Sequence, residues 1–201
     1  MDKLFYENLY IEKGAKYVCG VDEVGRGPLA GPVTVCAAIM DLSKIVDGVD
    51  DSKKLSEKKR EKLFPQICEA TVDMSIVSVG PEVIDEINIL QATFLAMQRA
   101  LDKLAVKPDL ALIDGNRAKD FGLPVRTIVK GDSLSSSIAA ASILAKVTRD
   151  RLMEQLDAQY PQYGFAVHKG YGTRRHYAAL REYGPCEIHR RTFLKKFYGG
   201  G

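Results

Sequence analysis

The sequence predicts an α/β fold in which a mixed sheet, part antiparallel and part parallel, is covered by helices. Two strand-like segments near the start of the chain are separated only by a short stretch rich in glycine, which favours a hairpin. Strand-like segments then alternate with longer ones of helical periodicity, the order typical of parallel strands joined by crossover helices. With 201 residues, 46% of them hydrophobic and 27% charged, the chain has the composition of a soluble globular domain.

Five segments have the character of strands. Residues 17–24 are largely apolar until two acidic residues near their end, and residues 33–40 are rich in small and β-branched side chains, so these two form the expected hairpin. Residues 71–80 alternate apolar and polar side chains, which is the period of a half-buried strand. Residues 110–113 are apolar throughout, and residues 125–129 form the last expected strand.

The first two helical segments contain helix-breaking residues. A loop that begins at residue 53 leads into a helix ending near residue 70, with Ser56 as its N-cap. We expect Pro65 to kink or split this helix. Apolar side chains then recur at helical spacing over residues 81–105, where we expect Asn88 to divide the segment into two helices.

The C-terminal part of the chain is also expected to be helical. Residues 135–158 form a long helix whose first half consists of small side chains, and residues 173–182 form a shorter helix followed by a basic tail. Because no repeat or linker is visible, we expect a single domain over residues 1–201. Its α/β core covers about residues 17–160, and a helical extension covers about residues 161–201.

Charge and cysteine content limit the class of protein. The formal net charge of +3 permits a polyanionic partner without requiring one. The four cysteines form no C-x-x-C pair, so neither a zinc site nor a disulfide framework is expected. No apolar stretch approaches ~18 residues, and residues 1–16 lack a signal-peptide core. We therefore expect a cytoplasmic protein outside the membrane, and a monomer, since no segment is typical of an oligomer interface.

Acidic residues follow three of the predicted strands. They are Asp22 and Glu23, Asp114, and Asp132. If these strands are neighbours, the four carboxylates converge at one edge of the sheet, and their mutual repulsion requires cations between them. Oxygen ligands without histidine or cysteine favour Mg²⁺ or Mn²⁺, and two such ions suit phosphodiester hydrolysis. An alternative for Asp132 is a helix cap, because a helix follows it directly.

Six motifs give a more specific indication than this spacing. They lie at residues 20–33, 51–56, 113–116, 130–147, 168–176 and 188–193. In this order they resemble the motifs of the ribonuclease HII family, with Thr192 where serine is more usual. The resemblance extends over roughly residues 17–193.

The resemblance implies a ribonuclease H-like fold, a mixed five-stranded sheet flanked by helices with a C-terminal helical extension. It implies that Asp22, Glu23, Asp114 and Asp132 are the catalytic, metal-binding acids for Mn²⁺ or Mg²⁺. The expected reaction is cleavage of RNA–DNA hybrids, and of duplex DNA on the 5′ side of a single ribonucleotide, leaving 5′-phosphate and 3′-hydroxyl ends. Roles in ribonucleotide excision repair and RNA primer removal would follow.

The resemblance also implies substrate-binding residues. Gly25, Arg26 and Gly27 match a ribose-sensing loop, whose glycines let the backbone approach a sugar closely; a tight hairpin turn is the alternative for these glycines. Tyr171 matches a tyrosine that reads the junction between RNA and DNA, the alternative being an aromatic residue that fills the core. Lys53 lies in a segment that resembles a phosphate-contacting loop, the alternative being a solvated lysine.

Two other functions remain to be weighed. The sister family, ribonuclease HIII, is less favoured because it generally lacks an arginine at the position of Arg26. A nucleic-acid-binding protein without catalysis is less favoured because four bare carboxylates would weaken binding to phosphate. For His168, His176 and His189 we expect structural hydrogen bonding rather than metal binding, because the acids already supply ligands for a hard metal.

Overall fold

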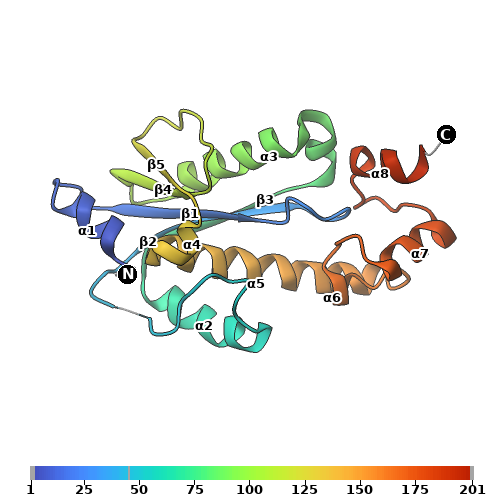
Figure 1. Ribbon diagram of the computed structural model, residues 1–201, viewed down its shortest axis with the longest axis horizontal. Coiled ribbons are helices and arrows are strands. Elements are labelled where there is room, and N and C mark those ends of the chain that lie inside the picture. Colours follow the sequence, from blue (N-terminus) through green and yellow to red (C-terminus); the bar gives the residue numbers. More distant parts are fainter. Residues whose placement is uncertain (1–2, 45, 200–201) are drawn as a thin grey trace.

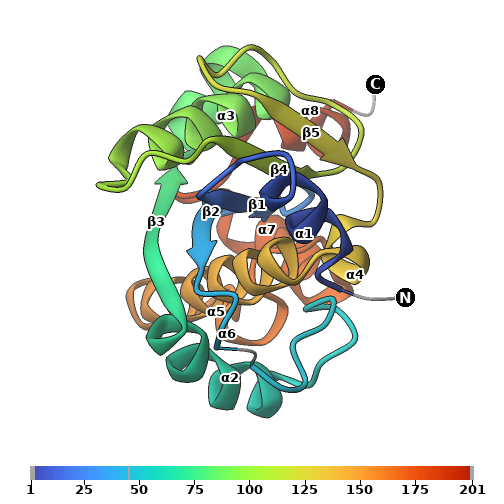
Figure 2. The same cartoon turned by 90° about the vertical axis from the view of Figure 1, so that its left-hand side faces the viewer.

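The computed structural model describes residues 3–44 and 46–199, in which one five-stranded sheet lies between layers of helices (Figures 1 and 2). The strands are β1 (Val18–Val24), β2 (Val33–Met40), β3 (Thr71–Val79), β4 (Leu110–Asp114) and β5 (Val125–Ile128), in the order β3-β2-β1-β4-β5. β1, β2 and β3 pair antiparallel, whereas β4 is parallel to both β1 and β5. The predicted mixed sheet and its N-terminal hairpin are therefore confirmed.

The helices occupy both faces of the sheet and one end of the molecule. α3 covers one face, while α5 covers the other with α2 packed on its outer side (Figure 2). α6, α7 and α8 gather at the end of the molecule opposite α1 (Figure 1). The helices are α1 (Phe5–Ile11), α2 (Glu57–Glu69), α3 (Pro81–Lys103), α4 (Gly131–Leu134), α5 (Ser136–Gln159), α6 (Phe165–His168), α7 (Arg174–Tyr183) and α8 (Arg191–Tyr198).

Alternation along the central strands divides the core into two layers. Successive side chains of a strand point to opposite faces of the sheet. Cys19 and Val21 of β1 therefore belong to the cluster beneath α3, together with Ala37 of β2. Cys36 and Ala38 of β2 belong to the cluster beneath α5. Both faces of β1 and β2 are thus covered, which explains why these strands have no polar face.

α5 lies unusually close to β1. A Cβ added at Gly20 would fall 2.1 Å from the carbonyl carbon of Ser137. The first half of α5 consists of small side chains, and Ala139, Ala140 and Ala141 are all buried against the sheet. A residue without a side chain on the strand and short side chains on the helix together permit this approach. The position of α5 relative to the end of β1 follows from it.

The two helix breakers behave differently. Asn88 has φ +66° and interrupts α3, and its Oδ1 accepts hydrogen bonds from the backbone N–H groups of Leu90 (3.0 Å) and Gln91 (3.2 Å). The predicted division at Asn88 is confirmed. For Pro65 we predicted a kink or a split, and the split is wrong, because α2 continues through this residue. The buried residues on either side of Pro65, Leu63 and Ile67, pack into the core and outweigh the lost hydrogen bond.

Four short helices were not predicted. α1 packs Tyr6 and Tyr10 against the core, while its Phe5 and Ile11 are exposed. It also delivers a buried acid: Oε1 of Glu7 accepts hydrogen bonds from Oγ of Ser135 (2.6 Å) and N of Ser137 (2.9 Å) at the start of α5. α4 and α6 have only four residues each, and α8 formed part of the expected basic tail. Their positions depend on contacts with distant segments rather than on local sequence.

The state of the cysteines and the character of the helices can be compared with what the sequence led us to expect. All four cysteines are unpaired, and Cys19 and Cys36 are completely buried. Over residues 3–44 and 46–199, no helix combines the length and apolar character needed to cross a lipid bilayer.

Substituting Gly20 tests the close approach of α5. A Gly20→Ala variant should be less stable by about 3 kcal/mol, because the new methyl group must displace the backbone of α5. Urea unfolding monitored by circular dichroism measures the change. Gly80→Ala is the matched control, since a Cβ at Gly80 meets no atom within 4 Å; because Gly80 is the N-cap of α3, this change should cost at most about 1 kcal/mol. Equal stability of the two variants would contradict the packing.

Candidate active site at the ends of three parallel strands

Three parallel strands end side by side and bring the predicted acids together. β4 pairs with β1 on one side and with β5 on the other. Val21 of β1 is opposite Ile113 of β4, so the next residues, Asp22 and Asp114, lie at the same level. Asp132 follows closely after β5, in α4. Since parallel strands end at the same edge of the sheet, all four carboxylates lie around the end of β4.

Asp22 and Glu23 approach this edge from opposite faces of β1, as consecutive strand residues must. Asp22 is 5% exposed, and its carboxylate accepts hydrogen bonds from its neighbour's backbone (Glu23 N to Oδ1, 2.7 Å) and from the hydroxyl of Ser142 on α5. Glu23 is paired with Arg26, whose Nη1 lies 3.2 Å from Oε1. Each acid is therefore held by a different layer of the molecule.

Asp114 and Asp132 are held by the segment that follows β5. Oδ1 of Asp114 accepts a hydrogen bond from the backbone N–H of Gly131 (2.7 Å). Asp132 is 5% exposed and lies inside α4. The residue at the N-cap of α4 is Lys130, and α5 is capped by Ser135, which accepts from Ile138. The alternative assignment of Asp132 as a helix cap is therefore wrong.

Burial and the repulsion between neighbouring carboxylates disfavour the charged forms of Asp22, Glu23 and Asp132. Burial raises the pKa of Asp22 well above its ordinary value, and the charges of Glu23 and Asp114 raise it further. Burial, with Asp114 and Asp51, raises the pKa of Asp132 in the same way. The pKa of Glu23 is raised by burial although Arg26 opposes the change. This arrangement stores electrostatic repulsion that a bound cation would relieve.

The chemistry of the four acids fits a hard divalent cation, since carboxylate oxygens without sulfur or imidazole are the ligands that Mg²⁺ and Mn²⁺ prefer. Across residues 3–44 and 46–199, no three acid, histidine or cysteine side chains are gathered closely enough to enclose a metal ion. Each of the four carboxylates is instead engaged by a hydrogen bond or an ion pair within the protein. Binding of a cation would therefore require these side chains to turn toward one another.

The loop that carries Lys53 reaches over the site from the direction of α2. Nζ of Lys53 lies 3.8 Å from Oδ2 of Asp132, and the side chain of Lys53 is 79% exposed. Although burial opposes it, the charge of Asp132 and other nearby acids raises the pKa of Lys53. The same loop brings Asp51 close to Asp132. Sequence reasoning assigned no role to Asp51, because it follows no strand.

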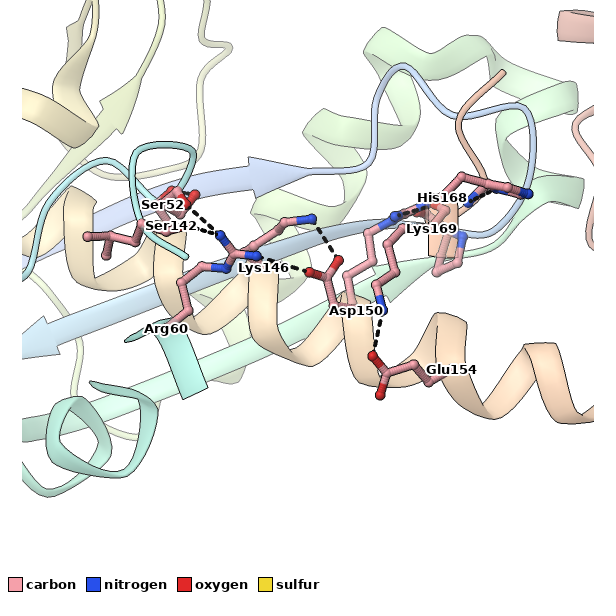
Figure 3. Close-up of polar contacts among 12 residues, drawn as sticks. Ser52, Arg60, Ser142, Lys146, Asp150, Glu154, His168 and Lys169 are labelled. Carbon is pink, nitrogen blue, oxygen red and sulfur yellow. Dashed lines mark hydrogen bonds and ion pairs between the residues drawn. The ribbon is translucent and has the colours of Figure 1, made fainter. Parts of the chain in front are cut away.

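A chain of polar side chains fixes this loop against α5 (Figure 3). Oγ of Ser52 lies 2.8 Å from Oγ of Ser142, the same serine that contacts Asp22. Arg60 of α2 donates to the backbone oxygen of Ser52 (2.9 Å), and its guanidinium lies 3.7 Å from Asp150 of α5. The position of the Lys53 loop is therefore linked to that of the acids.

The predicted substrate residues form a second group beside the acids. Gly25 has φ +90° and is buried, whereas Arg26 and Gly27 are exposed. Tyr171 is 44% exposed, so its alternative assignment as a core residue is wrong. A Cβ added at Gly27 would lie 3.6 Å from Cε1 of Tyr171. Segments that are more than 140 residues apart in the chain therefore meet at this point.

A cleft of about 110 Å³ opens between the acids and α3. Its walls are the polar side chains of the site and the apolar side chains of the helix. It is lined by Glu23, Arg26, Leu90, Thr93, Phe94, Met97, Asp114, Gly115, Asn116 and Arg117. Glu23 and Asp114 are therefore accessible from this side.

The three histidines lie together, remote from the acids and beneath the Tyr171 loop. Nδ1 of His176 lies 2.9 Å from the backbone oxygen of Tyr171, and its Nε2 lies 3.0 Å from Nε2 of His189. His168 stacks on His176 at 4.6 Å and accepts a hydrogen bond from the backbone of Gly170. The expected structural hydrogen bonding is confirmed for each histidine.

These contacts define one neutral proton arrangement. Nδ1 of His176 must carry a proton, because it faces a carbonyl oxygen. Its Nε2 is then the acceptor for His189, whose own Nδ1 accepts from the backbone N–H of Cys186 (3.0 Å). Nδ1 of His168 accepts from Gly170, so its Nε2 donates to Tyr163. An additional proton on any of the three rings would replace an acceptor by a donor and break a bond.

Comparison with known proteins gives a consistent result. The family described as Ribonuclease HII matches residues 19–196. The ribonuclease HII of Caldicellulosiruptor bescii is 53% identical over 189 residues, which are 94% of this chain and 92% of that protein. The ribonuclease HII of Burkholderia thailandensis is 57% identical over 176 residues, which are 88% of this chain and 82% of that protein.

The fold is also similar to solved structures. The crystal structure of the ribonuclease H2 from Pyrococcus horikoshii superimposes with a TM-score of 0.76 at 33% sequence identity. The match covers 91% of this chain and 97% of that one. The predicted ribonuclease H-like fold is therefore confirmed, and α6, α7 and α8 form the predicted C-terminal helical extension.

The histidine cluster predicts a pH dependence. Burial lowers the pKa of all three histidines, and that of His189 to about 4. At acidic pH the unfolded chain therefore binds more protons than the folded chain. The contribution of the neutral histidines to the free energy of unfolding is complete above pH 6.5 and is lost as the pH falls toward about 4. For His189 alone the loss is on the order of 3 kcal/mol.

The histidine Cε1–H signals measured by NMR during an acid titration check this directly. The buried acids of the site change stability in the opposite direction, so individual histidine signals are more informative than a melting curve. The chain has three histidines, and a His189→Gln variant assigns one signal. Titration of that signal near the ordinary value of 6.5 would contradict the network.

Proposed function

This chain belongs to the ribonuclease HII family and is an endoribonuclease, and on that premise we propose its substrate, its metal site and its binding residues. The proposed reaction is hydrolysis of the RNA strand in RNA–DNA hybrids, and of the bond on the 5′ side of a single ribonucleotide in duplex DNA. The products carry 5′-phosphate and 3′-hydroxyl ends. The protein acts as a monomer in the cytoplasm, in ribonucleotide excision repair and in removal of RNA primers.

The convergence of four acids at the ends of β1, β4 and β5 carries this proposal. Asp22 and Asp132 are almost completely buried, and the pKa values of both are raised by burial and by neighbouring carboxylates. A fold gains nothing in stability from such a group, so its presence supports a role in binding cations. A protein that only binds nucleic acid would be hindered by it, since carboxylates repel phosphates.

Asp22, Glu23, Asp114 and Asp132 are proposed to hold two divalent ions, Mg²⁺ or Mn²⁺. When bound, these ions supply an activated water molecule and stabilise the leaving oxygen of the phosphodiester. The protein contributes the placement of the acids. Ser142 of α5 and Gly131 of α4 hold Asp22 and Asp114 near one another before the substrate binds, and the carboxylates then turn toward the ions.

The remaining residues are proposed to recognise the substrate. Arg26 and Gly27 offer an exposed backbone beside Glu23, where a ribose hydroxyl can be tested at close range. Tyr171 offers a half-exposed ring beside Gly27, on which a sugar or base can stack. Lys53 is paired with Asp132 and becomes available for phosphate once a metal ion compensates that acid.

Neutralising Asp22 tests the catalytic assignment. An Asp22→Asn variant should cut duplex DNA with one ribonucleotide at least about 100-fold more slowly, because a direct metal ligand contributes more than a residue that merely orients one. Gel analysis of a labelled strand with Mn²⁺ or Mg²⁺ measures the rate. Asp102→Asn on the exposed side of α3 is the matched control and should cleave normally. Normal cleavage by Asp22→Asn would overturn the assignment.

Thermal unfolding tests metal binding without reference to activity. Mg²⁺ or Mn²⁺ at about 100 times its dissociation constant should stabilise the folded protein by about 2.7 kcal/mol. The double variant Asp22→Asn/Asp132→Asn should lose this effect. Without metal, the same variant should melt at a higher temperature than the wild type, because two buried, mutually repelled acids are gone. A metal-induced shift retained by the double variant would place the ions elsewhere.

A further inference from the structure

Two arginines outside the proposed metal site are completely buried. Arg149 lies on α5 and Arg190 lies directly before α8, and each is 0% exposed. Within residues 3–44 and 46–199, neither forms an ion pair with a carboxylate. A buried guanidinium without an acid is costly unless other groups satisfy its donors. The hydrogen-bond acceptors of the two arginines show which segments of the chain these side chains hold in place.

Arg190 is bound to the backbone of the proposed ribose-sensing loop. Its Nη2 donates to the carbonyl oxygen of Gly25 (2.5 Å) and its Nη1 to that of Arg26 (2.9 Å). Its Nε donates to the carbonyl oxygen of Gly31 (3.0 Å) at the far end of the same loop. One planar guanidinium therefore holds three carbonyl groups at fixed relative directions.

Arg149 extends the same arrangement toward the loop of Tyr171. Its Nε donates to Pro32 (2.9 Å) and its Nη2 to Ala30 (3.2 Å), which are both backbone oxygens of the glycine-rich segment. Its Nη1 donates to the backbone oxygen of Lys169 (3.0 Å), two residues before Tyr171. Arg149 thus connects the two segments that are proposed to contact the substrate.

The directions of two peptide groups follow from these bonds. All peptide bonds in the described residues are trans, and in a trans peptide the N–H points opposite to the preceding carbonyl. Since the carbonyls of Gly25 and Arg26 point to Arg190, the N–H groups of Arg26 and Gly27 point away from it. No acceptor within residues 3–44 and 46–199 receives either N–H. Both residues are exposed, so two adjacent donors face solvent.

We propose that Arg149 and Arg190 are positioning residues for substrate recognition. Arg190 directs the N–H groups of Arg26 and Gly27 toward the substrate, and Arg149 sets their position relative to Tyr171. The inference rests on the proposed function, because it concerns how that site distinguishes a ribonucleotide. It adds two residues whose side chains never touch the substrate.

Both arginines keep their charge in this environment. Burial lowers the pKa of Arg149 to about 10, and burial with the charge of Arg149 lowers that of Arg190 to about 9. Each value still lies above neutral pH. Charged donors make the stronger hydrogen bonds to carbonyl oxygens, so the two guanidinium groups hold the loop firmly at neutral pH.

The substitution Arg190→Lys tests the proposal. A lysine keeps the charge but cannot hold three carbonyls in one plane. Dissociation constants are measured by fluorescence anisotropy, in EDTA, for a DNA duplex with one ribonucleotide and for the same duplex made of DNA alone. Arg191→Lys is the matched control, since the neighbouring Arg191 is exposed. Arg149→Lys is measured in parallel.

For Arg190→Lys we expect the preference for the ribonucleotide duplex to fall by on the order of tenfold, while binding to the DNA duplex stays at the wild-type level. A purely structural role would weaken both duplexes in proportion, and that result would overturn the proposal, as would an unchanged preference. Wild-type cleavage is measured first with Mn²⁺ or Mg²⁺. If the wild type cuts no ribonucleotide-containing substrate, the proposed function itself is wrong.

If the Arg190→Lys variant does not fold, an NMR measurement on the wild-type protein tests the same proposal. Amide NMR signals of Arg26 and Gly27 should exchange rapidly with solvent in the free protein. They should shift and become protected on addition of the ribonucleotide duplex but not of the DNA duplex. Equal responses to both duplexes, or protection in the free protein, would show that these N–H groups do not read the ribose.

Discussion

The contact between α5 and β1 is the constraint on which the rest of the structure depends. Gly20 lets the helix backbone approach so closely that any side chain there would meet Ser137. The same helix then delivers Ser142 to Asp22 and, two turns later, Arg149 to the glycine-rich loop. A shift of α5 would therefore move a proposed catalytic acid and a proposed recognition segment together. The close packing of small side chains between α5 and β1 thus sets the distance between the proposed catalytic acids and the proposed recognition segment.

Buried charge is stabilised in two different ways in this molecule. The acids at the strand ends lie next to one another, and the raised pKa values of Asp22 and Asp132 express a repulsion that the protein alone does not relieve. Arg149 and Arg190 are completely buried, yet their donors are satisfied by backbone oxygens. The first arrangement requires a partner of opposite charge, whereas the second is complete by itself. Whether a buried charge is satisfied within the protein therefore distinguishes a binding site from a structural support more clearly than the degree of burial does.

The sequence predicted those features whose cause is local. The strand before Asp114 is a short apolar run, and Asn88 has both the conformational freedom and the side chain to interrupt a helix. The split at Pro65 failed because packing of neighbouring residues outweighs one lost hydrogen bond. Glu7 and Arg149 were not assigned, since a charged side chain in one sequence gives no sign of burial. Their partners are segments more than 100 residues away. The positions of the acids could be predicted, but not the groups that hold them.

The recognition segments are held by buried histidine and arginine side chains whose hydrogen-bond network depends on protonation state. Nε2 of His176 accepts from His189 only while it carries no proton, and Arg149 and Arg190 make their strongest hydrogen bonds to the glycine-rich loop as cations. Burial lowers the pKa of all three histidines, and that of Arg190 remains at about 9, so all these conditions hold over an interval around neutral pH. Within it, Tyr171 and Gly27 keep their relative position without help from substrate. Discrimination of a single hydroxyl requires such a prearranged site, because the free energy of one hydrogen bond is too small to order a mobile loop as well.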